Sequence, residues 1–280
     1  MRGDKAPPPT AKDPALSEYA LKLSDEELAR YRFMAESACA IEREMWASSG
    51  IVGGAVVADV GCGPGSVSAV IAELVGPGGR VLAVDREVET VETARALVAR
   101  TRRGNVDVMV GEAHDTGIPP ESVDVVMIRH VLAHNGPYEQ MIVDHAATLV
   151  RPGGCVYLAD LYARAFAVRP SDPDLDDLDD RYQEWHHQRG NDLATGLRLG
   201  ELLQAAGLEV VDHQGRYQIF TPPPGFRSPA WAARDALVTA GLATADDIER
   251  WRSAFERLDA ADRQPTVFVP LFFAYGRRAA

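Results

Sequence analysis

The sequence predicts a doubly wound α/β fold, in which helices cover both faces of a mostly parallel sheet. Two observations predict it. Short apolar runs alternate with segments of helical periodicity from residue 55 to residue 161, and a glycine-rich loop follows the first of these runs. Hydrophobic residues make up 46% of the 280 residues, which is enough apolar material for a full sheet and its helices. We therefore expect one α/β core with helical additions.

The N-terminal part of the chain is expected to precede the sheet. Residues 1–14 contain three consecutive prolines and scattered charges, and this composition predicts a flexible tail because it buries too little apolar surface to offset ordering. Ser24 is a good N-cap, and Glu27 three residues later completes a capping box, so a helix is expected to run from there towards Trp46. Residues 15–50 are therefore predicted to form a helical cap.

Five strands and three helices are predicted within a cofactor-binding core, residues 51–162. Each strand is a short apolar run, and each helix has apolar residues at spacings of three and four. Strands that alternate with helices imply a parallel sheet with right-handed crossovers. The predicted strands are 55–60, 80–85, 106–111, 123–129 and 155–161, and the predicted helices are 66–75, 89–102 and 138–150.

The second half of the chain is predicted to complete the core and to carry two insertions. A lid insertion is expected at 163–198, where an acidic stretch is followed by aromatic residues and histidines. The spacing of these acids lacks the glycine and terminal Glu of a calcium loop, so they predict a solvated helix face. Pro270 predicts a bulge or an edge position because proline donates no hydrogen bond to a sheet. The other predicted segments are the remainder of the core at 199–280, its helix at 199–206, its strands at 208–220 and 266–275, and a helical insertion at 228–263.

Charge and cysteine usage limit the partners and the compartment. The net charge of −12 argues against nucleic acid, because binding to phosphates draws its affinity from Lys and Arg. The sequence has no stretch of ~20 apolar residues, so no membrane partner is expected. Cys39, Cys62 and Cys155 form neither a paired framework nor a metal-ligand cluster, which indicates a reducing cytoplasm and no metal. We expect a cytoplasmic protein that acts on a small molecule, with a homodimer possible.

The glycine-rich loop after the first strand indicates the ligand class. Its glycines are Gly61, Gly63 and Gly65, whereas a dinucleotide fingerprint needs its third glycine at the position of Ser66. The lysine of a phosphate-binding P-loop is also missing. A loop with so few side chains lets a ligand lie directly on the backbone. The expected ligand therefore carries no phosphate.

Two carboxylates at the ends of adjacent strands describe the ligand further. Asp59 immediately precedes the glycine loop and can accept hydrogen bonds from an ammonium group. Asp85 ends the second strand, where a carboxylate accepts both ribose hydroxyls in α/β folds that bind nucleosides. Together they predict a nucleoside with an amino-acid tail.

Five motifs in this order resemble class I S-adenosylmethionine-dependent methyltransferases. The similarity is closest to the ubiquinone/menaquinone-biosynthesis-type branch, which includes many natural-product enzymes, and it covers roughly residues 50–162. It implies S-adenosylmethionine as the cofactor and a seven-stranded sheet whose last strand, 266–275, is antiparallel and lies between its neighbours. The motifs are D-V-G-C-G-P-G-S at 59–66, V-D at 84–85, G-E-A-H-D at 111–115, V-D-V-V at 123–126 and R-P-G-G at 151–154.

The resemblance also implies a role for individual residues of this chain. The glycine loop and Asp59 would hold the methionine part of the cofactor, and Asp85 with the adjacent Arg86 would hold the ribose. Glu112 and Ala113 would bind the adenine amino group. The backbone of Arg129 would line the methionine pocket, and an aromatic residue of the N-terminal cap, Tyr19, would close over the sulfonium.

Histidines after the fourth strand are the candidate catalytic groups. His130 and His134 lie where the acceptor pocket of this fold opens, and a neutral imidazole there could remove a proton from an acceptor oxygen or nitrogen. A purely structural role for His134 remains open. His186 and His187, in the predicted lid, are either substrate contacts or exposed helix residues.

The expected function is methyl transfer from S-adenosylmethionine to an oxygen, nitrogen or carbon atom of a small molecule, with a secondary metabolite as acceptor. Two alternatives remain open. The bound sulfonium could instead support cyclisation or decarboxylation without methyl transfer. The other alternative is a NAD-dependent oxidoreductase, against which Ser66 argues because it stands where the dinucleotide fingerprint needs a glycine. Modification of protein or RNA is disfavoured because the sequence is acidic and has no basic stripe.

Overall fold

The computed structural model describes residues 25–101 and 104–280. Its elements are α1 (Asp25–Ser49), β1 (Val56–Val60), α2 (Ser66–Val75), β2 (Arg80–Asp85), α3 (Val88–Thr101), β3 (Val106–Val110), β4 (Val123–Arg129), α4 (Glu139–Leu149), β5 (Val150–Leu161), β6 (Ala167–Arg169), α5 (Pro173–Gln188), α6 (Leu199–Ala205), β7 (Glu209–Phe220), α7 (Pro229–Ala232), α8 (Arg234–Thr239), α9 (Ala245–Asp259) and β8 (Thr266–Arg277). Short 3₁₀ helices are η2 (Leu132–His134), η3 (Gly136–Tyr138), η4 (Ala163–Ala165) and η5 (Thr195–Arg198). The predicted tail 1–14, the Ser24 cap and Tyr19 lie outside the described residues.

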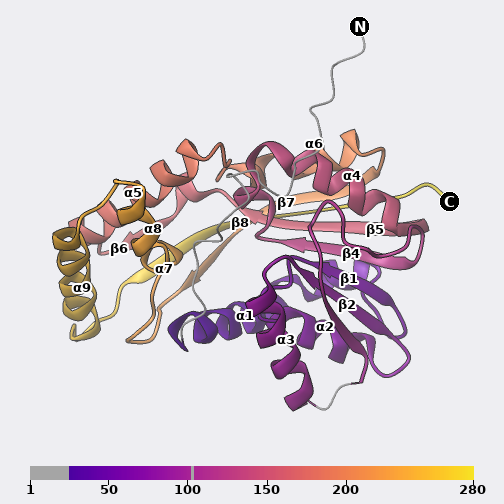
Figure 1. Cartoon of the computed structure of the whole chain (residues 1–280), viewed down its shortest axis with the longest axis horizontal. Helices are drawn as coiled ribbons and strands as arrows, with labels where there is room; N and C mark the ends of the chain where they lie inside the picture. The colour runs from indigo at the N-terminus through magenta and orange to yellow at the C-terminus, as the bar shows by residue number, and fades with distance from the viewer. Residues whose placement is uncertain (1–24, 102–103) are drawn as a thin grey trace, which may run out of the picture.

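One mixed sheet organises the molecule and confirms the predicted fold class (Figure 1). Its strand order is β3-β2-β1-β4-β5-β8, in which the first five strands are parallel and β8 is antiparallel to β5. β7 pairs with the other side of β8, so the last strand lies between its neighbours as expected. The short β6 also pairs with β8 and makes the sheet eight-stranded rather than seven-stranded.

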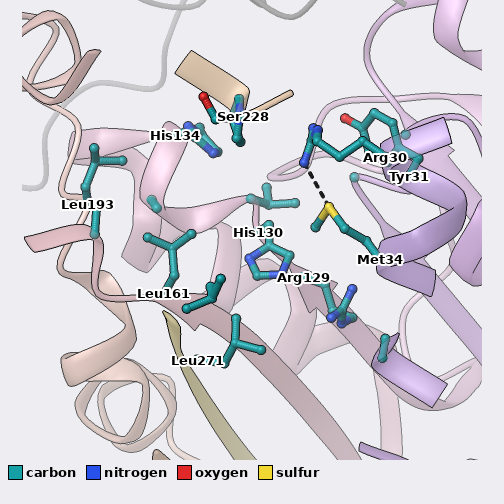
Figure 2. Close-up of a pocket in the computed structure, with 18 of the residues that line it drawn as sticks. Arg30, Tyr31, Met34, Arg129, His130, His134, Leu161, Leu193, Ser228 and Leu271 are labelled. Carbon is teal, nitrogen blue, oxygen red and sulfur yellow. Dashed lines mark hydrogen bonds between the residues drawn. The ribbon is translucent and has the colours of Figure 1, made fainter. Parts of the chain in front are cut away.

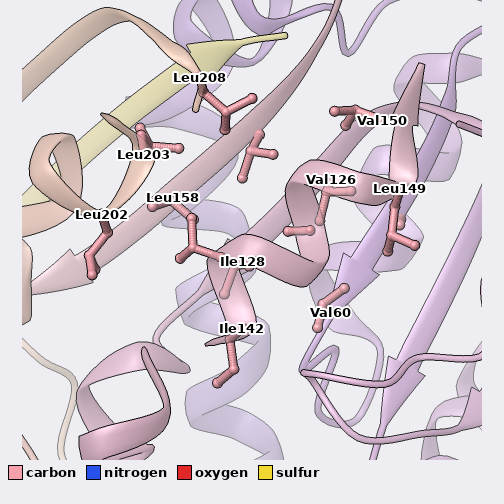
Figure 3. Close-up of a cluster of buried hydrophobic side chains, with 14 of the residues drawn as sticks. Val60, Val126, Ile128, Ile142, Leu149, Val150, Leu158, Leu202, Leu203 and Leu208 are labelled. Carbon is pink, nitrogen blue, oxygen red and sulfur yellow. The ribbon is translucent and has the colours of Figure 1, made fainter. Parts of the chain in front are cut away.

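Side chains alternate between the two faces of the sheet, and each face is covered by its own helices. On one face, Val126, Ile128 and Leu158 pack against α4 and α6 through residues such as Ile142 and Leu203 (Figure 3). On the other face, α1 and α2 cover a separate cluster that includes Val57, Met127 and Tyr157. Because both faces are buried, the carboxyl edge of the strands is the part of the sheet left available for a ligand.

Pro270 lies in an interior strand, which corrects the prediction of an edge position. The strand β8 is flanked by β7 on one side and by β5 and then β6 on the other. On that second side, β5 pairing ends at Leu271 and β6 pairing begins at Phe268. Pro270 therefore falls in the gap between two partner strands, where the sheet needs no N–H donor from it.

A third apolar cluster forms beyond the end of the sheet, within α5, α7, α8 and α9, which we call the outer helices (Figure 1). Trp251 is fully buried there. The acidic face of α5 is not simply solvated, as the sequence predicted, because it pairs with arginines of α9. Asp174 and Asp177 bind Arg250 at 2.7 Å each, and Asp172 binds Arg257 at 2.9 Å.

Candidate active site

A cavity of about 360 Å³ opens at the carboxyl ends of the strands, between α1, the sheet and the outer helices (Figure 2). It brings together most of the residues that the sequence singled out. Gly65 is not among the lining residues but faces α3, where an added Cβ would be 3.1 Å from Cβ of Ala94. The predicted site residues that line the cavity are Asp59, Gly61, Gly63, Asp85, Arg86, Glu112, Ala113, Arg129, His130 and His134.

The glycine loop has a backbone that side chains would disrupt. Gly61 and Gly63 have φ angles of 74° and 54°, in the left-handed region that favours glycine. A Cβ added to Gly61 would lie 2.3 Å from Cγ2 of Val131, the residue before η2. A side chain at this position would therefore require Val131 to move. The loop therefore presents bare backbone towards the cavity.

Asp59 is buried at the end of β1 and is 3% exposed. Oγ of Ser68 donates a 2.5 Å hydrogen bond to its carboxylate from the first turns of α2. Burial raises the pKa of Asp59 to about 6, although Ser68 and Arg129 both favour the ionised form. A bound ammonium group would supply the positive charge that this carboxylate lacks at close range.

Asp85 joins the ends of β2 and β1. Its carboxylate accepts the N–H of Gly63 at 2.9 Å and the N–H of Glu87 at 3.1 Å. Burial raises its pKa in spite of these bonds. A carboxylate has about four acceptor positions, so two remain for a diol such as that of ribose. The carboxylates of Asp59 and Asp85, together with the bare glycine loop between them, therefore fit a nucleoside that carries an amino-acid group.

The turn after β3 forms a further part of the cavity wall. Glu112 is exposed and forms an isolated backbone bridge with Asp115, which holds Ala113 and His114 at the wall between them. Arg86 lies at the end of β2 and pairs with Glu87 at 3.3 Å. The Glu112 side chain is thus exposed and at the same time part of the cavity wall.

Arg129 projects from the end of β4 into a buried network that the sequence did not predict. Its guanidinium binds Glu42 of α1 through two hydrogen bonds, of 2.6 Å and 3.1 Å. Glu42 also accepts hydrogen bonds from Nε1 of Trp46 at 3.1 Å and from the hydroxyl of Tyr157 at 2.9 Å. Burial opposes the charge of Arg129, but Glu42 outweighs it and raises the pKa of the guanidinium. The network fixes α1 over the cavity.

His130 follows β4 in a strained conformation. Its φ is +55°, which is uncommon for a residue other than glycine, and its N–H donates to the carbonyl of Ala159 at 2.8 Å. Nδ1 is buried, has no hydrogen-bond partner among the described residues, and lies 3.9 Å from the carboxylate of Asp160. Asp160 itself is 1% exposed and accepts the N–H of Ala133 at 3.0 Å.

His134 lies deeper in the cavity wall, on η2. Burial lowers its pKa to about 4, so the imidazole is neutral at pH 7. Its ring lies 4.9 Å from that of His186, whose pKa burial lowers to about 2. His186 is thus a buried residue held by Asn191, with 2.9 Å between Nδ1 and the amide nitrogen, whereas His187 is exposed. Neither His186 nor His187 lines the cavity.

Among residues 25–101 and 104–280, no group of three or more His, Cys, Asp or Glu side chains is arranged to hold a metal ion. No helix in this part of the chain is long and apolar enough to cross a membrane.

We expect Glu42→Gln to lower the free energy of unfolding by about 3–5 kcal/mol, because it leaves the buried Arg129 without its counter-charge. Urea denaturation measures this change. Glu44→Gln, two residues along the same helix and exposed, is the matched control and should stay within about 0.5 kcal/mol of the parent. Equal effects of the two substitutions would show that the network does not support the fold.

Comparison with known proteins agrees with this geometry. Residues 57–154 match the family model of the methyltransferase domain. The chain is 35% identical over 112 residues to arsenite methyltransferase of Halobacterium salinarum and 37% identical over 100 residues to nocamycin O-methyltransferase of Saccharothrix syringae. These matches cover 40% and 36% of this chain, and 28% and 35% of the relatives, so the chain spans about a third of the length of each relative. Demethylmenaquinone methyltransferase of Lactococcus lactis is 25% identical over 173 residues, with 58% of this chain and 68% of that protein covered.

Solved structures share the fold over nearly the whole chain. A methyltransferase of Aquifex aeolicus superposes with a TM-score of 0.53 at 14% identity and covers 91% of this chain and 98% of its own. Phosphoethanolamine N-methyltransferase 2 of Haemonchus contortus, in complex with S-adenosyl-L-methionine, gives a TM-score of 0.55 at 16% identity and covers 92% of this chain and 58% of its own. Residues 57–154 thus match a methyltransferase domain, and the chain as a whole has the fold of solved methyltransferases.

Proposed function

We propose that this protein transfers the methyl group of S-adenosylmethionine to an oxygen, nitrogen or carbon atom of an apolar small molecule, which we take to be a secondary metabolite. The observation that carries the proposal is the continuity of the cavity. One hollow is lined at one end by Asp59, the glycine loop and Asp85, and at the other by apolar side chains of the outer helices and β8. A donor and an acceptor can therefore meet inside one enclosed space.

The residues of the glycine-loop end would bind and orient the donor. S-adenosylmethionine, when bound, supplies an electrophilic methyl group on a sulfonium that is its own leaving group. In this proposal Asp59 binds the ammonium group, and Asp85, with Arg86 beside it, binds the ribose. Glu112 and Ala113 lie where the adenine would extend. Alignment of donor and acceptor in a closed site can supply ~7–11 kcal/mol of barrier reduction, so positioning is the main task of the protein.

An organic acceptor is favoured over arsenite. The domain is similar to that of an arsenite methyltransferase, and thiolates are the ligands that soft metal and metalloid centres prefer. Cys39, Cys62 and Cys155 are all free, but they lie on α1, in the glycine loop and in β5 and form no joint site with other ligand groups among the described residues. The similarity to nocamycin O-methyltransferase and to demethylmenaquinone methyltransferase supports an organic acceptor, and with it the natural-product branch.

Where the acceptor carries a removable proton, His130 is the residue we assign as general base. Its strained backbone places a buried, unpaired Nδ1 beside Asp160, and this carboxylate would stabilise the imidazolium formed by proton transfer. His134, the other candidate, is a weak proton acceptor because its pKa is about 4. We assign it to the shaping of the acceptor pocket together with His186.

We expect Asp85→Ala to weaken S-adenosylmethionine binding at least tenfold, because the substitution removes the acceptor of both ribose hydroxyls. Isothermal titration calorimetry measures the affinity, with NAD titrated in parallel as the ligand that should not bind. Asp144→Asn, an exposed acid on α4, is the control and should bind like the parent. Unchanged affinity in Asp85→Ala would remove the ribose assignment, and NAD binding would contradict the proposed cofactor.

The affinity for S-adenosylmethionine should fall as the pH is lowered through about 6. Burial raises the pKa of Asp59 to about 6. Only the ionised carboxylate has the negative charge that pairs with an ammonium group. Below this pH the site loses its counter-charge. Asp59→Asn should bind weakly at every pH between 5 and 8 and lose the transition near pH 6. A transition that survives in Asp59→Asn would assign the titration to another group.

With an acceptor that loses a proton, His130→Ala should lower kcat about 10²–10⁴-fold and leave S-adenosylmethionine affinity unchanged. Formation of S-adenosylhomocysteine measures the turnover and also separates methyl transfer from cyclisation or decarboxylation, which would not form it. His134→Ala and the exposed His187→Ala serve as comparisons. A larger loss of kcat in His134→Ala than in His130→Ala would reverse the assignment of the base.

A further inference from the structure

One carboxylate lies in the part of the cavity wall that the second half of the chain supplies. Among the lining residues from Leu161 to the C-terminus, all of which belong to the described part of the chain, Asp179 is the only charged side chain. The remaining polar groups at this end are neutral and include Gln183, Gln218 and Ser228. Asp179 is thus the one charge that the second half of the chain contributes to the cavity wall, whereas Arg30 of α1 and Arg86 after β2 contribute positive charge from the first half.

The position of Asp179 on α5 sets it apart from the other acids of that helix. Leu175, Leu178, Asp179 and Tyr182 follow one another at spacings of three, one and three, so they lie along the helix stripe that faces the cavity. A core-facing stripe of this kind is normally apolar. An acid at the position of Asp179 therefore needs a reason other than packing.

The neighbouring acids have partners, and Asp179 has none among the described residues. Asp172, Asp174 and Asp177 are each paired with arginines of α5 or α9, and Asp176 and Asp180 are exposed. No ion pair or hydrogen bond joins the Asp179 side chain to any described residue. Burial, together with Asp176 and Asp180, raises its pKa to about 7. The side chain is half-buried, so folding has removed part of the water around this carboxylate without supplying a counter-charge.

The same end of the cavity has aromatic walls. Phe33, Phe220 and Phe226 form a cluster with ring centroids 5.0 to 5.9 Å apart, and Phe166 and Phe255 also line the cavity. Aromatic faces attract cations through their quadrupole, and the attraction grows when water is excluded. A cavity wall that contains both aromatic rings and a carboxylate is a suitable environment for an ammonium group.

We infer that Asp179 binds a cationic amine of an otherwise apolar or aromatic acceptor. This inference rests on the proposed function, because it assigns the substrate class of the same cavity. An ammonium group would pair with a carboxylate that is already partly desolvated, whereas a neutral alcohol would gain one hydrogen bond and an anion would be repelled. Selectivity for amines over isosteric alcohols and acids follows from this arrangement.

The test compares three probes that differ only in their terminal group: 4-phenylbutylamine, 4-phenylbutanol and 4-phenylbutyrate. Each is titrated calorimetrically into the full-length protein saturated with S-adenosylhomocysteine. The parent protein should bind the amine at least tenfold more tightly than the alcohol or the acid. Asp179→Asn should abolish this preference, and Asp180→Asn, the exposed neighbour, should keep it.

Absence of amine binding to the parent, equal affinity for amine and alcohol, or an amine preference that survives in Asp179→Asn would each overturn the assignment. Asp179→Asn removes an unpaired, half-buried charge, so the melting temperature of the variant should not fall below that of the parent. Titration of S-adenosylmethionine into the same proteins without S-adenosylhomocysteine separates the two proposals. Loss of the amine preference with intact cofactor binding contradicts this inference alone, whereas absence of cofactor binding contradicts the proposed function.

Discussion

The buried carboxylate of Glu42 is the interaction on which the arrangement of the site depends. It accepts hydrogen bonds from Arg129 of β4, Tyr157 of β5 and Trp46 of its own helix. A charge of this kind is costly to bury unless it is fully paired, so the helix has one favourable position over the sheet. That position turns the part of α1 that contains Arg30 and Met34 towards the cavity, opposite His130 and His134 (Figure 2).

The cavity combines two chemically different ends, and each is built by a different part of the chain. The parallel half of the sheet supplies backbone groups and carboxylates at the ends of β1 and β2. The connections from these strands to α2 and α3 place these polar groups at the cavity. The antiparallel addition of β7 and β8, with the outer helices, supplies an apolar and aromatic enclosure. The methyltransferase domain model matches the first of these parts, and in the function proposed above the second part selects the acceptor.

Several groups in the site have a protonation equilibrium or a backbone conformation that is unfavourable for the stability of the fold. Asp59 and Asp179 are carboxylates whose pKa values are raised by burial, and His130 occupies a left-handed backbone conformation. Each feature makes the free protein less stable than a neutral or relaxed replacement would. A cationic ligand would reverse this for both carboxylates, because an opposite charge favours their ionised forms. The positions of these groups thus link the energetics of the fold to the charges expected on donor and acceptor.

The sequence by itself determined the fold class, because a parallel sheet with both faces covered needs long apolar runs and helical periodicity that can be read locally. Predicted strand 123–129 and helix 66–75 coincide with β4 and α2, and Asp59, Asp85 and two of the three loop glycines line one cavity. The tertiary structure alone decided the rest. Glu42 with Arg129, the gap that accommodates Pro270, the pairing of the α5 acids with α9, and the isolation of Asp179 all depend on contacts between segments far apart in the chain. A charged residue has the same local pattern whether it faces water, an arginine or a cavity, so only the packing of distant elements distinguishes these environments.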